Sequence, residues 1–290
     1  DFVAMGRMTF LDGGWTGGRD HSPTIKSLTA AYFTWTGGAT TPLFAKEPDA
    51  YGHGTAVAAV AAGDGGYQSP DSSGIATGAD LYDVRVLNEQ GVGNLADVLA
   101  GIDWVIQRSK LANIRVMNMS LGAASTDSFL VDPLARAARS ATAAGIVVVV
   151  SAGNAGKDDS GREMYGTVSS PGHEPTVITV GASNMLGTAK RSDDVMTTFS
   201  SRGPTRGSLT FANGNGWTDN LIKPDLVAPG NKLLTASGAD SSGTAAGLNL
   251  LARTYPALTQ VAGASQAPGQ TLMMLSGTSV AAPAVAGAAA

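Results

Sequence analysis

The sequence contains no cysteine among its 290 residues. This absence excludes a disulfide framework, thiol catalysis and a zinc site with cysteine ligands, although it leaves the cellular compartment open. Charge is also scarce: 14% of the residues are charged, the formal net charge is −4, and the one adjacent basic pair is Lys190 and Arg191. Such a chain has no positive surplus to neutralise a phosphate backbone, so we expect no nucleic acid among its partners.

Long apolar runs are missing as well. The longest run, residues 146–150 with its flanks, is far shorter than the roughly 20 residues that cross a bilayer, so we expect no membrane span. The first ten residues, DFVAMGRMTF, lack the charged region, the apolar region and the small-residue cleavage site of a signal peptide.

The chain is rich in small residues instead. It has 38 glycines, 43% hydrophobic residues and only 6% aromatic residues. This composition predicts tight turns and small side chains between closely packed layers, and it argues against disorder. The length suits a single globular domain over residues 1–290.

Strand-like and helix-like segments alternate along the chain. Short β-branched and apolar runs predict strands, most of them buried on both faces, at 7–12, 80–87, 114–120, 146–152 and 176–182. Helical spacing predicts helices at 55–62, 95–108 and 131–144, with Asn94 or Gly93 opening the second and Gly145 closing the third. The alternation implies βαβ units and a parallel sheet. The Gly, Ser and Asn-rich stretches 63–74, 203–216 and 238–247 are interpreted as surface loops.

Four polar residues are candidates for chemistry, because ligands bind beyond the carboxyl ends of strands and at helix starts in such folds. Asp12 closes an apolar run, and His53 lies between two glycines before a helix of Ala and Val. Asn154 follows the strand run IVVVV and is an amide donor that could stabilise an oxyanion. Ser279 opens another Ala/Val-rich helix, where developing negative charge is favoured.

Each candidate also has an ordinary structural explanation. An Asp-Gly pair after a strand is commonly a turn, a histidine or serine before a helix is commonly satisfied by backbone, and a Gly-rich turn after a strand can belong to a nucleotide fold. The nucleotide interpretation fails because neither G-x-G-x-x-G nor G-K-[ST] follows. Pro283 would leave the carbonyl of Ser279 without its helical partner. Together the residues run in the order Asp, His, Asn, Ser, which differs from the Ser, acid, His order of α/β-hydrolases.

Two segments carry a family resemblance: HGTAVAAVAAG around His53 and GTSVAAPAVAG around Ser279. The chain resembles the subtilisin-like serine peptidases at these motifs. It also resembles them at VMNMSLG, SAGN, SSPGHEPTVITVGA, FSSRGPT and IKPDLVAPG, so the resemblance spans nearly the whole chain. It implies a three-layer α/β/α fold with a mostly parallel central sheet.

The resemblance implies a serine endopeptidase that works through an acyl-enzyme. Ser279 would be the nucleophile, His53 the general base, Asp12 the orienting acid and Asn154 an oxyanion donor, with Asp20 and Asp49 as weaker candidates for the acid because neither closes an apolar run. Polypeptide substrates would pair with the strand at 117–122, and an uncharged pocket would be formed by Ser120, Leu121, Gly122, Ala152, Gly153 and Ser169.

The sequence also departs from the family pattern. Gly13 and Gly14 follow Asp12 where the family has Ser or Thr and then Gly, and Ala284 follows Pro283 where the family commonly has His. Only 11 residues precede Asp12 and the chain stops inside the serine-bearing helix, so we expect a domain that is incomplete at both ends. These departures keep two alternatives open: a catalytically impaired binding module and a serine esterase.

Other expectations rest on the resemblance alone. No cofactor is needed for the chemistry. Structural calcium and a propeptide partner are compatible with the family, and a secreted or cell-surface location is implied. The stretch 63–73 contains Asp64 and Asp71 but no D-x-D-x-D-G loop, so no metal ligands are assigned.

Overall fold

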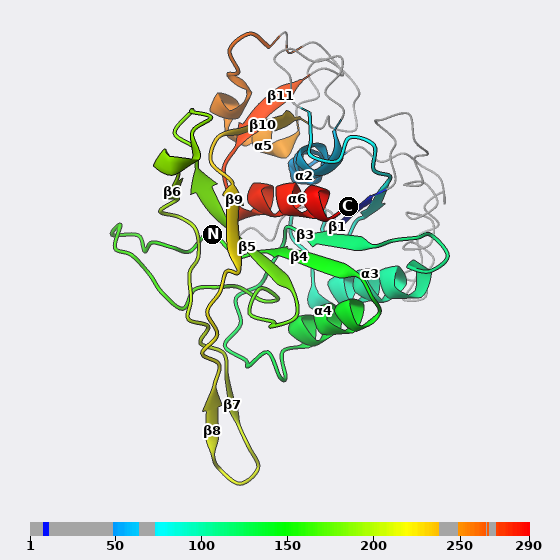
Figure 1. Cartoon of the computed structure of the whole chain (residues 1–290), viewed down its shortest axis with the longest axis vertical. Coiled ribbons are helices and arrows are strands. Elements are labelled where there is room, and N and C mark those ends of the chain that lie inside the picture. The colour runs from blue at the N-terminus through cyan, green and yellow to red at the C-terminus, as the bar shows by residue number, and fades with distance from the viewer. Residues whose placement is uncertain (1–7, 12–48, 64–72, 238–248, 265, 267–270) are drawn as a thin grey trace.

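The computed structural model describes residues 8–11, 49–63, 73–237, 249–264, 266 and 271–290. Within these residues a seven-stranded sheet forms the centre of the molecule, with the strand order β2-β1-β3-β4-β5-β6 and with β9 paired to β5 (Figure 1). Its strands are β1 (Met8–Leu11), β2 (Leu81–Val84), β3 (Val116–Met119), β4 (Val147–Ser151), β5 (Ile178–Asn184), β6 (Val195–Met196) and β9 (Leu226–Pro229).

The sheet is mostly parallel, as expected, but not entirely. Strands β3, β4, β5 and β9 run parallel to their neighbours in the series. Strand β1 pairs antiparallel with both β2 and β3, and the short β6 pairs antiparallel with the end of β5. The parallel pairing expected from the alternation of strands and helices therefore does not extend to β1, β2 and β6, and the sheet as a whole is mostly parallel. The long connection from β1 to β2 can return the chain in either direction, so alternation alone does not fix strand direction.

Helices cover both faces of the sheet, which confirms the three-layer α/β/α architecture (Figure 1). Strand residues alternate between the two faces because the side-chain period of a strand is two. Met117, Met119 and Val150 point to the layer formed by α3 (Leu95–Arg108) and α4 (Pro133–Ala143). Val116 and Val149 point to α6 (Thr278–Ala289) on the opposite face, and α2 (His53–Ala62) packs beside α6.

The small residues of α2 and α6 let the two helices approach closely. A methyl group on Gly287 of α6 would lie 2.6 Å from the carbonyl oxygen of Ala61 in α2. A larger side chain at this crossing would force the helices apart, because close-packed interiors have no spare volume. The Ala and Gly-rich composition of both segments is thus explained by a backbone-to-backbone contact.

The helix boundaries follow the sequence signals closely. Helix α3 spans the predicted 95–108, and the Asn94 side chain accepts a hydrogen bond from the backbone N–H of Asp97, as an N-cap does. Helix α4 begins two residues later than predicted, because Asp132 caps it by accepting from Ala135 N–H. None of the described helices is long and apolar enough to cross a membrane.

One predicted loop is wrong in part. Within 203–216 and just beyond it, β7 (Ser208–Thr210) and β8 (Gly216–Thr218) form an antiparallel hairpin that projects from the body (Figure 1). Its strands are only three residues each, too short for a periodic signal, and Gly214 adopts a positive φ at the turn. The predicted loops 63–74 and 238–247 lie almost entirely outside the described residues.

The remaining described elements lie on the α2 side of the molecule or at the edge of the sheet. Strands β10 (Leu233–Ala236) and β11 (Leu272–Leu275) pair with each other to form a small antiparallel sheet. The other elements are α5 (Leu250–Thr254) and the short 3-10 helices η2 (Arg191–Asp193) and η3 (Pro256–Thr259).

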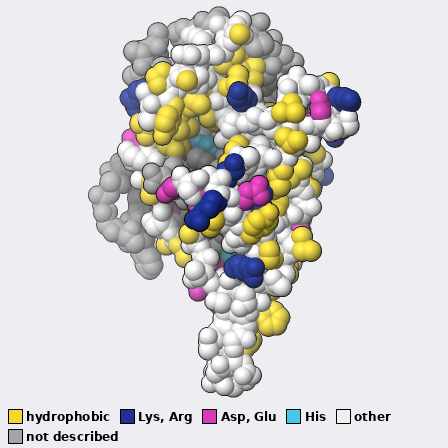
Figure 2. Space-filling model, turned by 90° about the vertical axis from the view of Figure 1, so that its left-hand side faces the viewer, with side chains coloured by type: hydrophobic (Ala, Val, Ile, Leu, Met, Phe, Trp, Pro, Cys, Tyr) yellow, Lys and Arg dark blue, Asp and Glu magenta, His cyan; other side chains and the backbone are white. Residues whose placement is uncertain are grey.

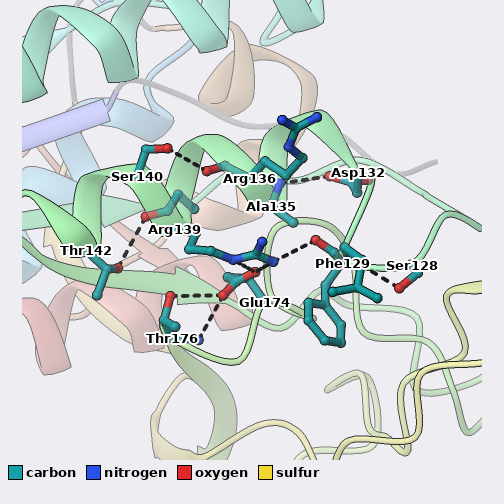
Figure 3. Close-up of polar contacts among 12 residues, drawn as sticks. Ser128, Phe129, Asp132, Ala135, Arg136, Arg139, Ser140, Thr142, Glu174 and Thr176 are labelled. Carbon is teal, nitrogen blue, oxygen red and sulfur yellow. Dashed lines mark hydrogen bonds and ion pairs between the residues drawn. The ribbon is translucent and has the colours of Figure 1, made fainter.

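An ion pair between a buried glutamate and a part-exposed arginine ties α4 to the segment before β5 (Figure 3). Glu174 is completely buried, and its Oε2 accepts from Nε and Nη2 of Arg139 while its Oε1 accepts from the hydroxyl and N–H of Thr176. Arg139 also donates to the carbonyl of Phe129 at 2.8 Å and lies 5.5 Å above that ring. Both oxygens of the Glu174 carboxylate therefore accept hydrogen bonds. Without Arg139 the buried carboxylate would lose its positively charged partner and both donors to Oε2.

We expect Arg139→Met to lower the free energy of unfolding by about 3 kcal/mol, because removing one partner strands a buried charge. Urea denaturation followed by circular dichroism measures this change. Arg136→Met is the matched control: Arg136 lies on the exposed side of the same helix and points away from the pair (Figure 3), so its effect should stay within about 0.5 kcal/mol. Equal effects of the two substitutions would contradict the role given to the pair.

Candidate active site

His53 and Ser279 meet at the starts of α2 and α6. The Nε2 atom of His53 lies 3.0 Å from Oγ of Ser279, although the residues are 226 positions apart in the chain. The two side chains are 2% and 3% exposed. Histidine side chains on the face shown in Figure 2 are visible only in recesses between other residues. The packing of α2 on α6 thus forms a base and hydroxyl pair within hydrogen-bonding distance.

The backbone around His53 requires glycine. Gly52 has φ of 94°, which L-residues with a side chain rarely adopt, and a methyl group there would lie 2.2 Å from Cγ of Asn249. The Asp49 carboxylate accepts hydrogen bonds from the N–H groups of Gly52 and Thr55, at 2.9 and 2.7 Å. Asp49, a weaker candidate for the orienting acid, therefore fixes the turn that presents His53.

Burial controls the charge of His53. Removal from water disfavours the imidazolium ion and lowers the pKa of His53 to about 4, while the nearby Asp49 carboxylate opposes this shift. The Nδ1 atom is buried and has no hydrogen-bond partner among the described residues. Asp12 and Asp20, the other two candidates for the acid, lie outside the described residues.

Asn154 is held so that its amide group borders Ser279. Its Oδ1 accepts from the backbone N–H of Thr278 at 2.9 Å and from the Thr278 hydroxyl at 3.2 Å. A methyl group on Gly277 would lie 3.0 Å from Ser279 Oγ, 3.4 Å from Asn154 Nδ2 and 3.7 Å from the Ser279 N atom. Gly277 therefore leaves open a small space bounded by the hydroxyl and two N–H donors, the geometry that stabilises a developing oxyanion.

Gly277 and Thr278 are functional positions that sequence reasoning did not assign. Thr278 orients Asn154, and its hydroxyl also accepts from the backbone N–H of Gly153 at 3.0 Å. The signal available in the sequence was the G-T-S motif itself, but its first two residues gain meaning only from their contacts with Asn154 and Gly153.

The Ser120 hydroxyl supplies the hydrogen bond that Pro283 removes from α6. Proline has no N–H to donate to the carbonyl four residues earlier, and this is the carbonyl of Ser279. The Ser120 hydroxyl donates to that carbonyl at 2.6 Å, and Asn118 Nδ2 lies 3.0 Å from the same hydroxyl. The end of β3 therefore anchors the backbone of Ser279 through a side chain.

Two of the residues expected to form a pocket contact the start of α6: the Ser120 hydroxyl donates to the Ser279 carbonyl, and the Gly153 N–H donates to the Thr278 hydroxyl. Gly153 and Ser169 are adjacent, since a methyl group on Gly153 would lie 3.0 Å from Ser169 Oγ, and Ser169 N–H donates to the Ala152 carbonyl. Ser120 continues from β3 and contacts Ser279, and Leu121 and Gly122 follow it. The Leu121 side chain itself packs into the core beneath α3 and α4. None of these residues is charged.

The described part of the chain contains no group of three or more acidic or histidine side chains that could hold a metal ion. The stretch with Asp64 and Asp71 lies almost wholly outside it. The chemistry open to the site is activation of the Ser279 hydroxyl by a neutral imidazole beside an oxyanion space, which is the chemistry of acyl transfer.

Known proteins resemble this chain along most of its length. The family model described as "Subtilase family" matches residues 20–290. Serine protease AprX of Bacillus subtilis (strain 168) is 38% identical over 247 residues, which cover 83% of this chain and 48% of AprX. Subtilisin-like protease 1 of Arthroderma gypseum is 32% identical over 207 residues, covering 70% of this chain and 34% of that protein. The chain thus spans about half or less of these relatives.

Solved structures show the same fold. Sphericase superposes with a TM-score of 0.59 at 25% identity, covering 87% of this chain and 66% of its own. The S41 psychrophilic protease superposes with a TM-score of 0.57 at 25% identity, covering 82% and 62% respectively.

We expect Ser120→Ala to slow covalent labelling of Ser279 by a fluorophosphonate about tenfold, because the freed carbonyl lets the nucleophile backbone shift. Loss of the donor should also lower the free energy of unfolding by about 1–3 kcal/mol. Ser140→Ala is the control, since that exposed hydroxyl also donates to one backbone carbonyl, in α4. Unchanged labelling of the Ser120 variant would refute the anchoring role.

Proposed function

The chain belongs to the subtilase family, and from this premise we propose that it is a serine endopeptidase that hydrolyses peptide bonds through an acyl-enzyme. The observation that carries the proposal is the 3.0 Å approach of His53 Nε2 to Ser279 Oγ beside a space with two N–H donors. The chain spans about half or less of the length of these relatives.

In the proposed reaction the Ser279 Oγ attacks the peptide carbonyl carbon while Nε2 of His53 takes its proton. His53 then gives this proton to the leaving amine, and a water molecule repeats the sequence on the acyl-enzyme. His53 must be neutral to act as the base. Its burial supports this role, since burial lowers the pKa and keeps the ring uncharged at neutral pH.

The oxyanion of the tetrahedral intermediate would occupy the space beside Gly277. Asn154 Nδ2 and the backbone N–H of Ser279 would donate to it. Because Asn154 Oδ1 is held by Thr278, the amide is oriented before substrate binds, and no reorganisation is needed in the transition state.

We assign the orienting acid to Asp12. Support comes from its place directly after β1 (Met8–Leu11) and from the order of the motifs along the chain. The buried Nδ1 of His53, which lacks a partner among the described residues, is the atom to which its carboxylate would bind. Residue 12 precedes the range that the family model matches, so the assignment rests on strand position and chain order.

The substrate would add as a strand beside residues 120–122. Strand β1 pairs with β3 at Thr9 and Asn118, and beyond Met119 this edge meets no strand among the described residues. An open edge of this kind accepts an extended peptide by backbone hydrogen bonds. The uncharged surroundings of Ala152, Gly153 and Ser169 favour an uncharged side chain before the cleaved bond, and strict cleavage after Lys or Arg would contradict this preference.

A secreted or cell-surface location, a propeptide partner and structural calcium also belong to the proposal. Their support is the family alone. The structure adds that no described helix could span a membrane.

The function is tested by hydrolysis of a panel of peptides and by fluorophosphonate labelling. We expect Ser279→Ala to abolish both. We expect Asn154→Ala to lower kcat by about 10²–10³ with little change in KM, because its donor acts on the oxyanion. Hydrolysis of esters without any peptide hydrolysis would favour the esterase alternative. Absence of labelling in the wild type would favour a binding module.

The role of Asp12 is tested through the pKa of His53. A carboxylate on Nδ1 stabilises the imidazolium and raises the pKa, whereas burial lowers it. In Asp12→Asn we therefore expect the pKa of His53 to fall below its wild-type value, so that the ring takes up its proton at a lower pH than in the wild type. NMR titration resolves this, since the chain has three histidines. The same His53 pKa in both proteins would exclude Asp12.

A further inference from the structure

The β7–β8 hairpin is a feature that the proposed mechanism does not use. It projects from the end of the molecule opposite to β10 and β11 (Figures 1 and 2). Residues 208–218, SLTFANGNGWT, carry no charge. Phe211 is 43% exposed and Trp217 is 46% exposed, in a chain with only four tryptophans.

The apolar side chains of the hairpin share one face. Leu209 is paired directly with Trp217 across the two strands, and Phe211 lies two residues after Leu209. Alternation along a strand therefore places Leu209, Phe211 and Trp217 on the same side. Ser208, Thr210 and Thr218 lie on the other side. We call the three apolar residues the aromatic face of the hairpin.

The hairpin is firmly held at its root. Asp219 is 1% exposed and its carboxylate accepts from the Ser128 hydroxyl at 2.6 Å, the Phe129 N–H at 2.9 Å and Trp217 Nε1 at 3.0 Å. The Trp217 ring is thus fixed by a buried acceptor while its surface is half open. A pre-oriented aromatic side chain is a favourable anchor for a partner, because little side-chain entropy is lost on binding.

The root of the hairpin adjoins the continuation of the proposed substrate strand. Ser208 N–H donates to the Thr126 carbonyl at 2.8 Å, and Ser128 N–H donates to the Ser208 carbonyl at 2.9 Å. The chain from Ser120, which contacts Ser279, to Asp127, which bridges to Ser208, covers eight residues and therefore seven residue-to-residue steps. Fully extended, this is at most about 23 Å, the span of about seven substrate residues.

In the proposed function the substrate residues on the acyl side of the cleaved bond pair beside 120–122. A substrate that continued along residues 123–128 would place each further residue nearer to the hairpin root. An extended polypeptide would therefore reach the hairpin root with residues about five to eight positions before the cleaved bond.

We propose that the aromatic face of the hairpin is an accessory binding surface for the polypeptide substrate, where it takes apolar side chains well upstream of the cleaved bond. The inference rests on the proposed function. The absence of charge suits an uncharged segment. The outer edge of β8, which pairs with no other strand among the described residues, suits an extended one. Short substrates would not reach this surface.

Two peptide substrates of the same cleavage sequence test the inference. One has four residues before the cleaved bond, and the other has ten, with Leu and Phe at positions five to eight. In the Phe211→Ala, Trp217→Ala double variant we expect kcat/KM for the long peptide to fall about tenfold, mainly through KM, the size expected for loss of an aromatic anchor. The value for the short peptide should stay within about twofold.

Matched variants separate binding from misfolding. Phe211→Ala alone removes no hydrogen bond and should give a smaller loss of the same kind. Leu111→Ala, an exposed apolar residue beyond α3, should change neither peptide. Equal loss for both peptides, or no loss for either, would overturn the inference.

Binding of the long peptide to Ser279→Ala protein, measured by calorimetry, tests the surface without turnover. The double hairpin substitution should weaken this binding about tenfold, and unchanged binding would overturn the inference. If the wild type cleaved neither peptide, yet binding of the long peptide still depended on the hairpin, the result would contradict the proposed function and leave the inference about the hairpin standing. Self-association that disappears in the double variant, with unchanged hydrolysis of the long peptide, would assign the hairpin to a second copy and overturn the inference.

Discussion

The close packing of α2 against α6 is the constraint on which the site depends. Two helices built from Ala, Gly and Val approach until a backbone carbonyl of one nearly touches Gly287 of the other. Their starts then lie side by side, and the first residue of one and the second residue of the other are His53 and Ser279. Larger side chains would separate the helices by more than the hydrogen bond between these residues tolerates.

Residues that follow β3 and β4 supply side-chain hydrogen-bond partners for backbone groups at the start of α6. The carbonyl of Ser279, left without a helical donor by Pro283, is satisfied by Ser120 at the end of β3. Asn154, at the end of β4, accepts the N–H of Thr278 and turns its own amide toward Ser279. Each of these contacts satisfies a buried backbone group and at the same time positions a group needed for acyl transfer, so stability and chemistry rest on the same hydrogen bonds.

A second polar network connects α4 to the root of the β7–β8 hairpin. Arg139 donates to the Glu174 carboxylate and to the carbonyl of Phe129. The N–H of Phe129 and Nε1 of Trp217 both donate to the Asp219 carboxylate. This chain of contacts runs from α4 to the root of the hairpin. It gives a fixed orientation to a surface that would be marginally stable as an isolated two-stranded hairpin.

The sequence by itself determined the layered α/β class, the limits of α3 through the Asn94 cap, and the identity of His53, Asn154 and Ser279 as the groups to examine. These signals are local: periodicity, capping residues and short motifs act within one or two turns of chain. The tertiary structure alone decided the antiparallel direction of β1, the short hairpin, and the use of Asp49, Ser120, Gly277 and Thr278. Most of those features depend on contacts between residues far apart in the chain or on strands of three residues, where local pattern carries no information about which groups will meet. Asp49 is the exception: its partners Gly52 and Thr55 lie three and six positions away, but no sequence motif singled out this contact.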